Sequence, residues 1–160
     1  MSLVLRFATP GDVATILRFV HELAEFEREA DKVVATEELL HEAMFGERPG
    51  AEAVIAERDG APLGMALFFH NFSTWTGWRG LYLEDLYVTP EARGQGVGAA
   101  LLRHLAAIAV DRGCTRFEWA VLDWNEKAIK FYKTMGAEPM DEWTVNRVSG
   151  EALTKLAGRS

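Results

Sequence analysis

The stretch YVTPEARGQGVGAALLRHL, residues 87–105, gives the clearest indication of the fold. Three glycines alternate within GQGVG, and an apolar pattern with helical spacing starts directly behind them. Glycine is the poorest ordinary helix former, so three of them at a helix start need a reason. Glycines permit unusual backbone angles and close approach of another group. The pattern therefore predicts a helix from about Val97 to Arg112, preceded by a loop that a ligand approaches closely.

The composition is that of a globular protein. The chain has 160 residues, of which 49% are hydrophobic and 26% charged, and we expect one domain over residues 1–160. A net charge of −7 argues against a nucleic-acid partner and suits a cationic one. No apolar run approaches the roughly 18 residues of a membrane span, and the N-terminus lacks a signal-peptide core. The single cysteine, Cys114, excludes an intramolecular disulfide and indicates a reducing, cytoplasmic compartment.

Hydrophobic periodicity and turn signals divide the chain into alternating elements. Strands are predicted at residues 2–9, 53–57, 63–69, 81–88, 115–122 and 143–150, and helices at 13–26, 36–45, 97–112, 125–136 and 150–157. Asp59-Gly60 is a hairpin turn signal, and residues 71–80 are predicted to be a loop. Hairpin-linked strands followed by strands alternating with helices imply an α/β fold with a mixed sheet flanked by helices.

Three interpretations of the glycine loop compete. A Walker loop is absent, because no G-x-x-x-x-G-K-(S/T) run occurs. The dinucleotide pattern is formally met by Gly94, Gly96 and Ala99, and Glu118 lies about the expected 20 residues further on. That pattern should begin directly at a strand end, however, and residues 89–93 intervene. A flexible glycine turn without a ligand is the alternative that involves no phosphate. The third interpretation as a phosphate site comes from another motif.

A more specific match is Arg93-Gly94-Gln95-Gly96-Val97-Gly98, which fits (R/Q)-x-x-G-x-(G/A). Backbone N–H groups in such a loop point at an anion, and the helix dipole adds a favourable field. The motif occurs together with YLEDLYV at 82–88, ILRFVHELAEFE at 16–27 and WNEKAIKFYKTMGA at 124–137. With these segments, the chain resembles the GNAT N-acetyltransferase superfamily. Within it the chain is similar to the diamine acetyltransferases, which include spermidine/spermine and thialysine enzymes.

The resemblance implies the GNAT fold, acetyl-CoA as cosubstrate and no metal, in agreement with four histidines that show no metal-ligand spacing. It also implies where the cosubstrate is bound. The pyrophosphate is assigned to Arg93, Gly94, Gln95, Gly96, Val97 and Gly98, and the pantetheine arm to the backbone of Leu86, Tyr87 and Val88 and to Asn125 and Ala128. Independently of the resemblance, Asn125 is a predicted N-cap of the helix behind it.

Acetylation of an amine at neutral pH needs a base, because a primary ammonium has a pKa near 10.4. The resemblance favours Glu84 as this base, acting through water; the alternative is a surface carboxylate. In a regular strand Glu84 and its neighbour Asp85 point to opposite faces, although a bulge would change this. Tyr132 is the candidate acid for the leaving thiolate, because a tyrosine hydroxyl is protonated at neutral pH. The alternative for Tyr132 is a half-buried core tyrosine.

Further residues are candidates for binding a cationic amine. Phe26 and Glu27 would border the cleft, together with Asp85, and a homodimer is expected, with this segment contributed across its interface. The acidic run around Glu27 can equally be a solvated helix face. Trp75 could pack against an alkyl chain or a cation, or simply anchor its loop. Whether an acid at 141–142 faces the substrate stays open.

These features predict an acetyl-CoA-dependent N-acetyltransferase that acts on a primary amine of a small, diamine- or polyamine-like substrate. Direct attack by the amine in a ternary complex is expected, because no covalent nucleophile is evident. One alternative acetylates the side chain of thialysine or another amino acid. Another, of a different class, is a non-catalytic sensor that binds CoA or polyamines.

Overall fold

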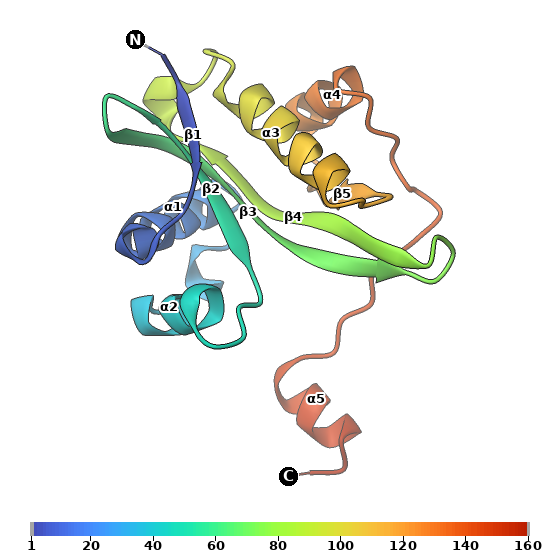
Figure 1. Cartoon of the computed structure of the whole chain (residues 1–160). Coiled ribbons are helices and arrows are strands. Elements are labelled where there is room, and N and C mark those ends of the chain that lie inside the picture. The colour runs from blue at the N-terminus through green and yellow to red at the C-terminus, as the bar shows by residue number, and fades with distance from the viewer. Residues whose placement is uncertain (1, 160) are drawn as a thin grey trace. The chain divides into compact units, whose positions relative to one another are not determined.

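The computed structural model describes residues 2–159 (Figure 1). The chain divides into two compact units between Ala120 and Val121. The first unit is a five-stranded sheet covered by helices on both faces, and the second contains two short helices. The expectation of a single domain stays a prediction.

The first unit contains β1 (Val4–Phe7), α1 (Val13–Phe26), α2 (Glu37–Phe45), β2 (Glu52–Arg58), β3 (Ala61–Ser73), β4 (Trp78–Val88), α3 (Val97–Asp111) and β5 (Phe117–Trp119). Short 3-10 turns lie at Pro10–Asp12, Ala30–Lys32 and Pro90–Ala92. The second unit contains α4 (Glu126–Thr134) and α5 (Gly150–Leu156). The predicted helices are all present, with ends within a few residues of those expected.

The sheet has the strand order β1-β2-β3-β4-β5. The first three pairings are antiparallel, and β4 pairs with β5 in parallel. The β2–β3 turn has positive φ at both Asp59 and Gly60, as a tight hairpin turn of this type requires. The parallel pair needs a crossover, and α3 provides it. The predicted mixed sheet flanked by helices is therefore confirmed.

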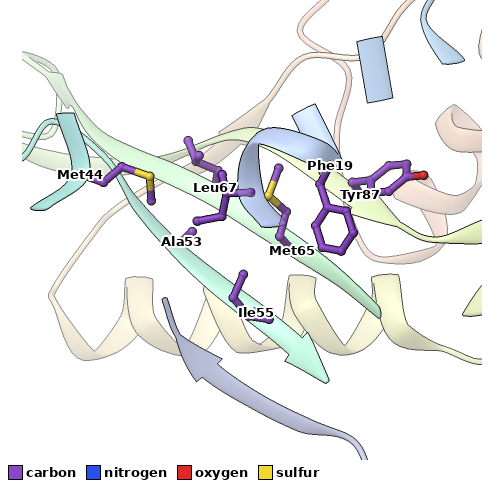
Figure 2. Packing of buried hydrophobic residues seen from close by; sticks show 8 residues of the cluster. Phe19, Met44, Ala53, Ile55, Met65, Leu67 and Tyr87 are labelled. Carbon is purple, nitrogen blue, oxygen red and sulfur yellow. The ribbon is translucent and has the colours of Figure 1, made fainter. Parts of the chain in front are cut away.

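The helices of the first unit lie on opposite faces of this sheet: α1 and α2 on one, α3 on the other (Figure 1). Ile16 and Phe19 on the apolar face of α1 belong to one buried cluster with Met65 of β3 and Tyr87 of β4. Figure 2 shows Phe19 beside Met65 and Tyr87. The rings of Phe19 and Tyr87 are 5.3 Å apart between centroids. Residues of the strands that belong to this cluster therefore lie on the sheet face toward α1.

The predicted loop at 71–80 is mostly strand. β3 and β4 continue through it to the pair Ser73–Trp78, so only residues 74–77 form the turn. The hydroxyl oxygen of Ser73 accepts hydrogen bonds from the backbone N–H groups of Trp75 and Thr76, at 3.2 and 3.4 Å. The polar composition that suggested a loop belongs instead to a hairpin end stabilised by local side-chain bonds.

Two other strand predictions are wrong. β5 covers only Phe117–Trp119 rather than 115–122, because its pairing with β4 ends at Leu83, next to an irregularity in β4. Residues 143–150 form no strand within the described chain. An alternating apolar pattern shows that a segment can enter a sheet, but a strand forms only where a neighbouring edge is available to it.

Among residues 2–159, no helix is long and apolar enough to cross a membrane.

Candidate active site

A β-bulge interrupts β4 at the predicted catalytic carboxylates. Leu67 of β3 is opposite Asp85, whereas the next residue, Phe68, is opposite Leu83, which leaves Glu84 as the extra residue. In a bulge two residues oppose a single partner, so the usual alternation of side chains is lost at that point. The regular-strand geometry, in which Glu84 and Asp85 point to opposite faces, therefore does not apply here, and the alternative of a bulge does.

The pairings around the bulge show which face the carboxylates share. Asp85 is opposite Leu67, which belongs to the core cluster under α1. Phe69 follows Leu67 by two residues on β3 and therefore lies on the same face. Tyr82 is opposite Phe69, and their ring centroids are 5.1 Å apart. Asp85 and Tyr82 thus face α1, whereas Leu83, opposite Phe68, faces away from it. The charge of Glu84 acts on Asp85, Tyr82 and Glu27, so Glu84 lies on the α1 side as well.

Three carboxylates influence one another at this place. Burial raises the pKa of Asp85 from its ordinary value of 3.8 to about 6, and the charges of Glu84 and Glu27 add to the effect. The pKa of Glu27 is also raised, by burial and then by the charges of Glu29 and Glu84. Like charges in a partly buried site are costly unless a cation neutralises them. The bulge and the end of α1 therefore form a site suited to a cation.

This crowding predicts a gain in stability when Asp85 is replaced by asparagine. The carboxyl of Asp85 ionises near pH 4 in the unfolded chain but only near pH 6 in the folded protein. The free energy of unfolding of the wild type therefore falls as the pH rises from about 4 to about 6. Asp85→Asn should therefore raise the free energy of unfolding by about 1–3 kcal/mol at pH 7 and by almost nothing below pH 4. Urea unfolding at both pH values measures this.

The exposed carboxylate Glu38 on α2 offers a matched control. Glu38→Gln removes the same charge from a surface position and should change the free energy of unfolding by less than about 0.5 kcal/mol. Equal gains for the two variants at pH 7 would show that overall charge, rather than the crowding at the bulge, is responsible.

The glycine loop has the conformation that an anion site needs. Gly94 and Gly96 have φ angles of 79° and 82°, a region that favours glycine. Both are exposed, and a Cβ at either would meet no atom within 4 Å. The first N–H groups of any helix have no partner within the helix. Gly96, the N-cap of α3, has no side chain that could bind them. The loop residues therefore fit a pyrophosphate group.

Two side chains of the loop are bound to the sheet. The Nε of Arg93 donates to the carbonyl oxygen of Val88 at 3.0 Å, and its guanidinium lies 5.7 Å from the ring centroids of both Phe26 and Tyr87. Gln95 accepts a hydrogen bond of 2.9 Å from Arg58 of β2. The loop is thereby held next to the end of α1 and the end of β4.

The backbone of β4 beyond the bulge has one strand neighbour within the first unit. Residues 86–88 pair with β3, whereas the pairing with β5 ends at Leu83. The edge toward β5 is therefore available to an extended ligand, as expected for the pantetheine arm. One group on this stretch is already engaged, because the carbonyl oxygen of Val88 accepts the bond from Arg93.

The structure does not bring Trp75 to the carboxylates. Trp75 lies in the β3–β4 turn, 78% exposed, with the guanidinium of Arg116 at 5.7 Å from its ring centroid. Trp78, where β4 begins, is six positions from Glu84, which corresponds to about 20 Å along a strand. The alternative interpretation, that Trp75 anchors its loop, agrees better with its contact to Arg116.

The second unit holds Asn125, Ala128 and Tyr132 on α4. Asn125 is the N-cap, and its side-chain oxygen accepts a bond of 3.3 Å from the N–H of Ala128, as predicted. Ala128 and Tyr132 are four residues apart and so lie on one face of the helix. Tyr132 is half-buried. Asp141 and Glu142 follow α4 and are exposed.

Sequence reasoning missed two residues next to the bulge. Tyr82 and Glu118 are opposite each other in the β4–β5 pair, on the face that Glu84 shares. Glu118 was noted only for its distance from the glycines. The pairing of β5 with β4 was the missing information, because it decides on which face of the sheet each side chain of β5 lies.

Within residues 2–159, no group of three or more His, Cys, Asp or Glu side chains is arranged to hold a metal ion.

Comparison with known proteins agrees with this geometry. The model of the Acetyltransferase (GNAT) family matches residues 17–137. Thialysine N-epsilon-acetyltransferase of Sus scrofa is 44% identical over 99% of both chains, and that of Caenorhabditis elegans is 39% identical over 93% of both. The spermidine/spermine N(1)-acetyltransferase-like protein 1 of Homo sapiens is 33% identical over 96% of this chain and 23% of its own length.

A solved structure shows the same fold over nearly the whole length. An integron cassette protein from the mobile metagenome of V. cholerae has a TM-score of 0.82 and 31% sequence identity, covering 98% of each chain. The resemblance inferred from the glycine motif and the segments around it is thus confirmed by sequence and by fold. The chain therefore belongs to the acetyltransferase (GNAT) family, whose cosubstrate is acetyl-CoA, and it is an N-acetyltransferase.

Proposed function

We propose that the enzyme acetylates a primary amine of a small, cationic, diamine- or polyamine-like substrate, by direct attack of the amine in a ternary complex. The observation that carries this proposal is the group of three carboxylates, Glu27, Glu84 and Asp85, at the bulge of β4. A bound ammonium relieves their mutual repulsion, which an anionic or neutral substrate cannot do. The net charge of −7 also favours the approach of a cation.

The residues of the chain have separate roles in this proposal. Acetyl-CoA supplies the acetyl group as a thioester. Glu84 takes a proton from the substrate ammonium through water, so that the neutral nitrogen forms the new C–N bond as the C–S bond breaks. The hydroxyl of Tyr132 donates a proton to the leaving sulfur, the acetylated nitrogen releases its excess proton to water, and the tyrosinate takes a proton back from water. Asp85 and Glu27 bind the ammonium before its proton is removed, and Phe26 borders them.

A panel of amines with release of the CoA thiol as readout tests the proposal. Diamines and polyamines should be acetylated with higher kcat/KM than neutral or anionic amines of similar size. Binding of acetyl-CoA without thiol release from any amine would contradict the enzyme mechanism and favour a CoA- or polyamine-binding sensor.

Thialysine, or another amino acid with a side-chain amine, is the second candidate substrate. It is favoured by the relatives that are 39–44% identical, which are thialysine N-epsilon-acetyltransferases. An amino acid carries its own carboxylate, which needs a cation in the site. Arg93, next to Phe26 and Tyr87, is a charged group that could meet this need, although Arg93 and its neighbours in the loop are also assigned to pyrophosphate.

Replacement of Gly96 by valine tests the assigned cosubstrate site. A Cβ there has space, so the effect comes from the backbone: a β-branched residue strongly disfavours a φ of 82°. The loop must then rearrange its N–H groups, and we expect acetyl-CoA affinity to fall at least tenfold in a folded protein. Calorimetric titration measures the affinity, and circular dichroism checks the fold.

Gly98→Ala is the matched control for this experiment. Gly98 lacks the positive φ of its neighbours, and a Cβ there would make an ordinary contact of 3.8 Å with Val88. The motif also accepts alanine at this position. We expect nearly unchanged affinity for Gly98→Ala, and unchanged affinity in folded Gly96→Val would remove the loop as the pyrophosphate site.

Two further properties complete the proposal. We expect a cytoplasmic enzyme, because a single cysteine, Cys114, suits a reducing compartment. We also expect a homodimer, in which the segment around Phe26 and Glu27 lies near the partner. Light scattering coupled to size-exclusion chromatography measures the oligomeric state.

A further inference from the structure

The sheet face beyond the bulge carries a fourth carboxylate. Tyr82 of β4 is opposite Phe69 on one side and Glu118 of β5 on the other. Residues directly opposite in neighbouring strands project from the same face, so Glu118 lies on the face toward α1 that also carries Glu84. The pKa of Tyr82 is raised by burial and then by the charges of Glu84 and Glu118, so both carboxylates are close to its hydroxyl.

Glu118 is held in place by a side chain that reaches across β4. The Nδ2 of Asn71 on β3 donates to Oε1 of Glu118 at 3.2 Å. Asn71 is opposite Gly80 on the intervening strand, and a Cβ at Gly80 would lie 2.5 Å from the amide oxygen of Asn71. Glycine at this position therefore makes room for the amide to pass. The bond orients the half-buried carboxylate of Glu118 through its Oε1 atom.

The distance between Glu118 and the bulge suits a short substrate with two charges. Strand rise and strand spacing place the Cα atoms of Glu118 and Glu84 about 8 Å apart. An extended five-carbon diamine spans a comparable distance. The side chain of Tyr82 is near both carboxylates, because it is opposite Glu118 and its pKa is raised by the charges of Glu84 and Glu118. Phe69 lies on its other side, with the two tilted rings 5.1 Å apart between centroids, and an aromatic surface accepts both an alkyl chain and a cation.

We propose that Glu118 is a specificity-determining residue, which binds a second cationic nitrogen of the substrate while the first is acetylated beside Glu84. This inference rests on the proposed function and decides between its two candidates. A diamine gains an ion pair at Glu118. An amino acid has an ammonium and a carboxylate at that end, so attraction of the one is offset by repulsion of the other.

Three amines with the same carbon chain test this assignment: pentylamine, 1,5-diaminopentane and lysine. We expect Glu118→Gln to lower kcat/KM for 1,5-diaminopentane about tenfold, because it removes one charge-assisted contact, and to change that for pentylamine less than twofold. Glutamine retains an oxygen that accepts the bond from Asn71, so the strand contact is kept. Glu118→Arg should reverse the order and make lysine a better substrate than 1,5-diaminopentane.

The control is Glu38→Gln, which removes one negative charge from α2 and should leave the ratios among the three amines unchanged. Equal losses of kcat/KM for pentylamine and 1,5-diaminopentane in Glu118→Gln, or an unchanged ratio, would overturn the assignment. Calorimetric titration with the same amines gives a readout that does not depend on turnover. A wild type that binds 1,5-diaminopentane more tightly than Glu118→Gln does, yet acetylates no amine, would contradict the proposed function and support the role of Glu118.

Discussion

Glu84→Gln is expected to lower the rate of acetyl transfer at neutral pH by about 10²–10⁴-fold, the usual contribution of general-base catalysis. Glutamine has the size of glutamate but cannot take the proton from the substrate ammonium. The loss should shrink as the pH rises, because a growing share of the amine is already neutral. Initial rates from pH 6 to 10, with saturating acetyl-CoA, measure this.

Asp85→Asn is the control for the loss in Glu84→Gln, because the bulge places both carboxylates on one face. If Asp85 only binds the ammonium, its variant should raise KM for the amine more than it lowers kcat. A larger fall in kcat for Asp85→Asn than for Glu84→Gln would move the role of base to Asp85. A loss below about threefold for Glu84→Gln at every pH would remove that role from Glu84 as well.

Tyr132→Phe is expected to slow the chemical step by about 10²-fold or more, with acetyl-CoA affinity nearly unchanged. Phenylalanine retains the ring and its packing on α4 but cannot donate a proton to the leaving sulfur. A purely structural tyrosine would lose only a hydrogen bond, about 1 kcal/mol of folding free energy. Rapid-quench kinetics is the suitable measurement, because slow product release can hide a chemical defect.

Phe131→Leu is the matched control, since Phe131 precedes Tyr132 on α4, and their ring centroids are 5.5 Å apart. It tests whether a change of packing at the same turn of the helix is enough to slow the reaction. Similar rates of acetyl transfer in Tyr132→Phe and the wild type, with chemistry shown to be limiting, would leave the hydroxyl structural and the acid unassigned.

The sequence by itself determined the features that depend on neighbours along the chain. The start of α3 at Val97 and the left-handed glycines before it follow from the motif. Asn125 caps α4 as predicted, because an N-cap bond joins residues only three positions apart. The family is equally accessible, since its motifs are local patterns at characteristic separations.

The tertiary structure decided which carboxylates act together. Nothing in YLEDLYV shows the bulge, because a bulge is a mismatch between two strands and depends on how β4 meets Leu67 and Phe68 of β3. It brings Asp85 and Glu84 to one face, and burial there raises the pKa of Asp85 to about 6. The pairing of β5 with β4 likewise places Glu118 opposite Tyr82. Strand register joins residues far apart in the chain, and a shift of one residue moves a side chain to the other face, so only the folded sheet determines the composition of the site.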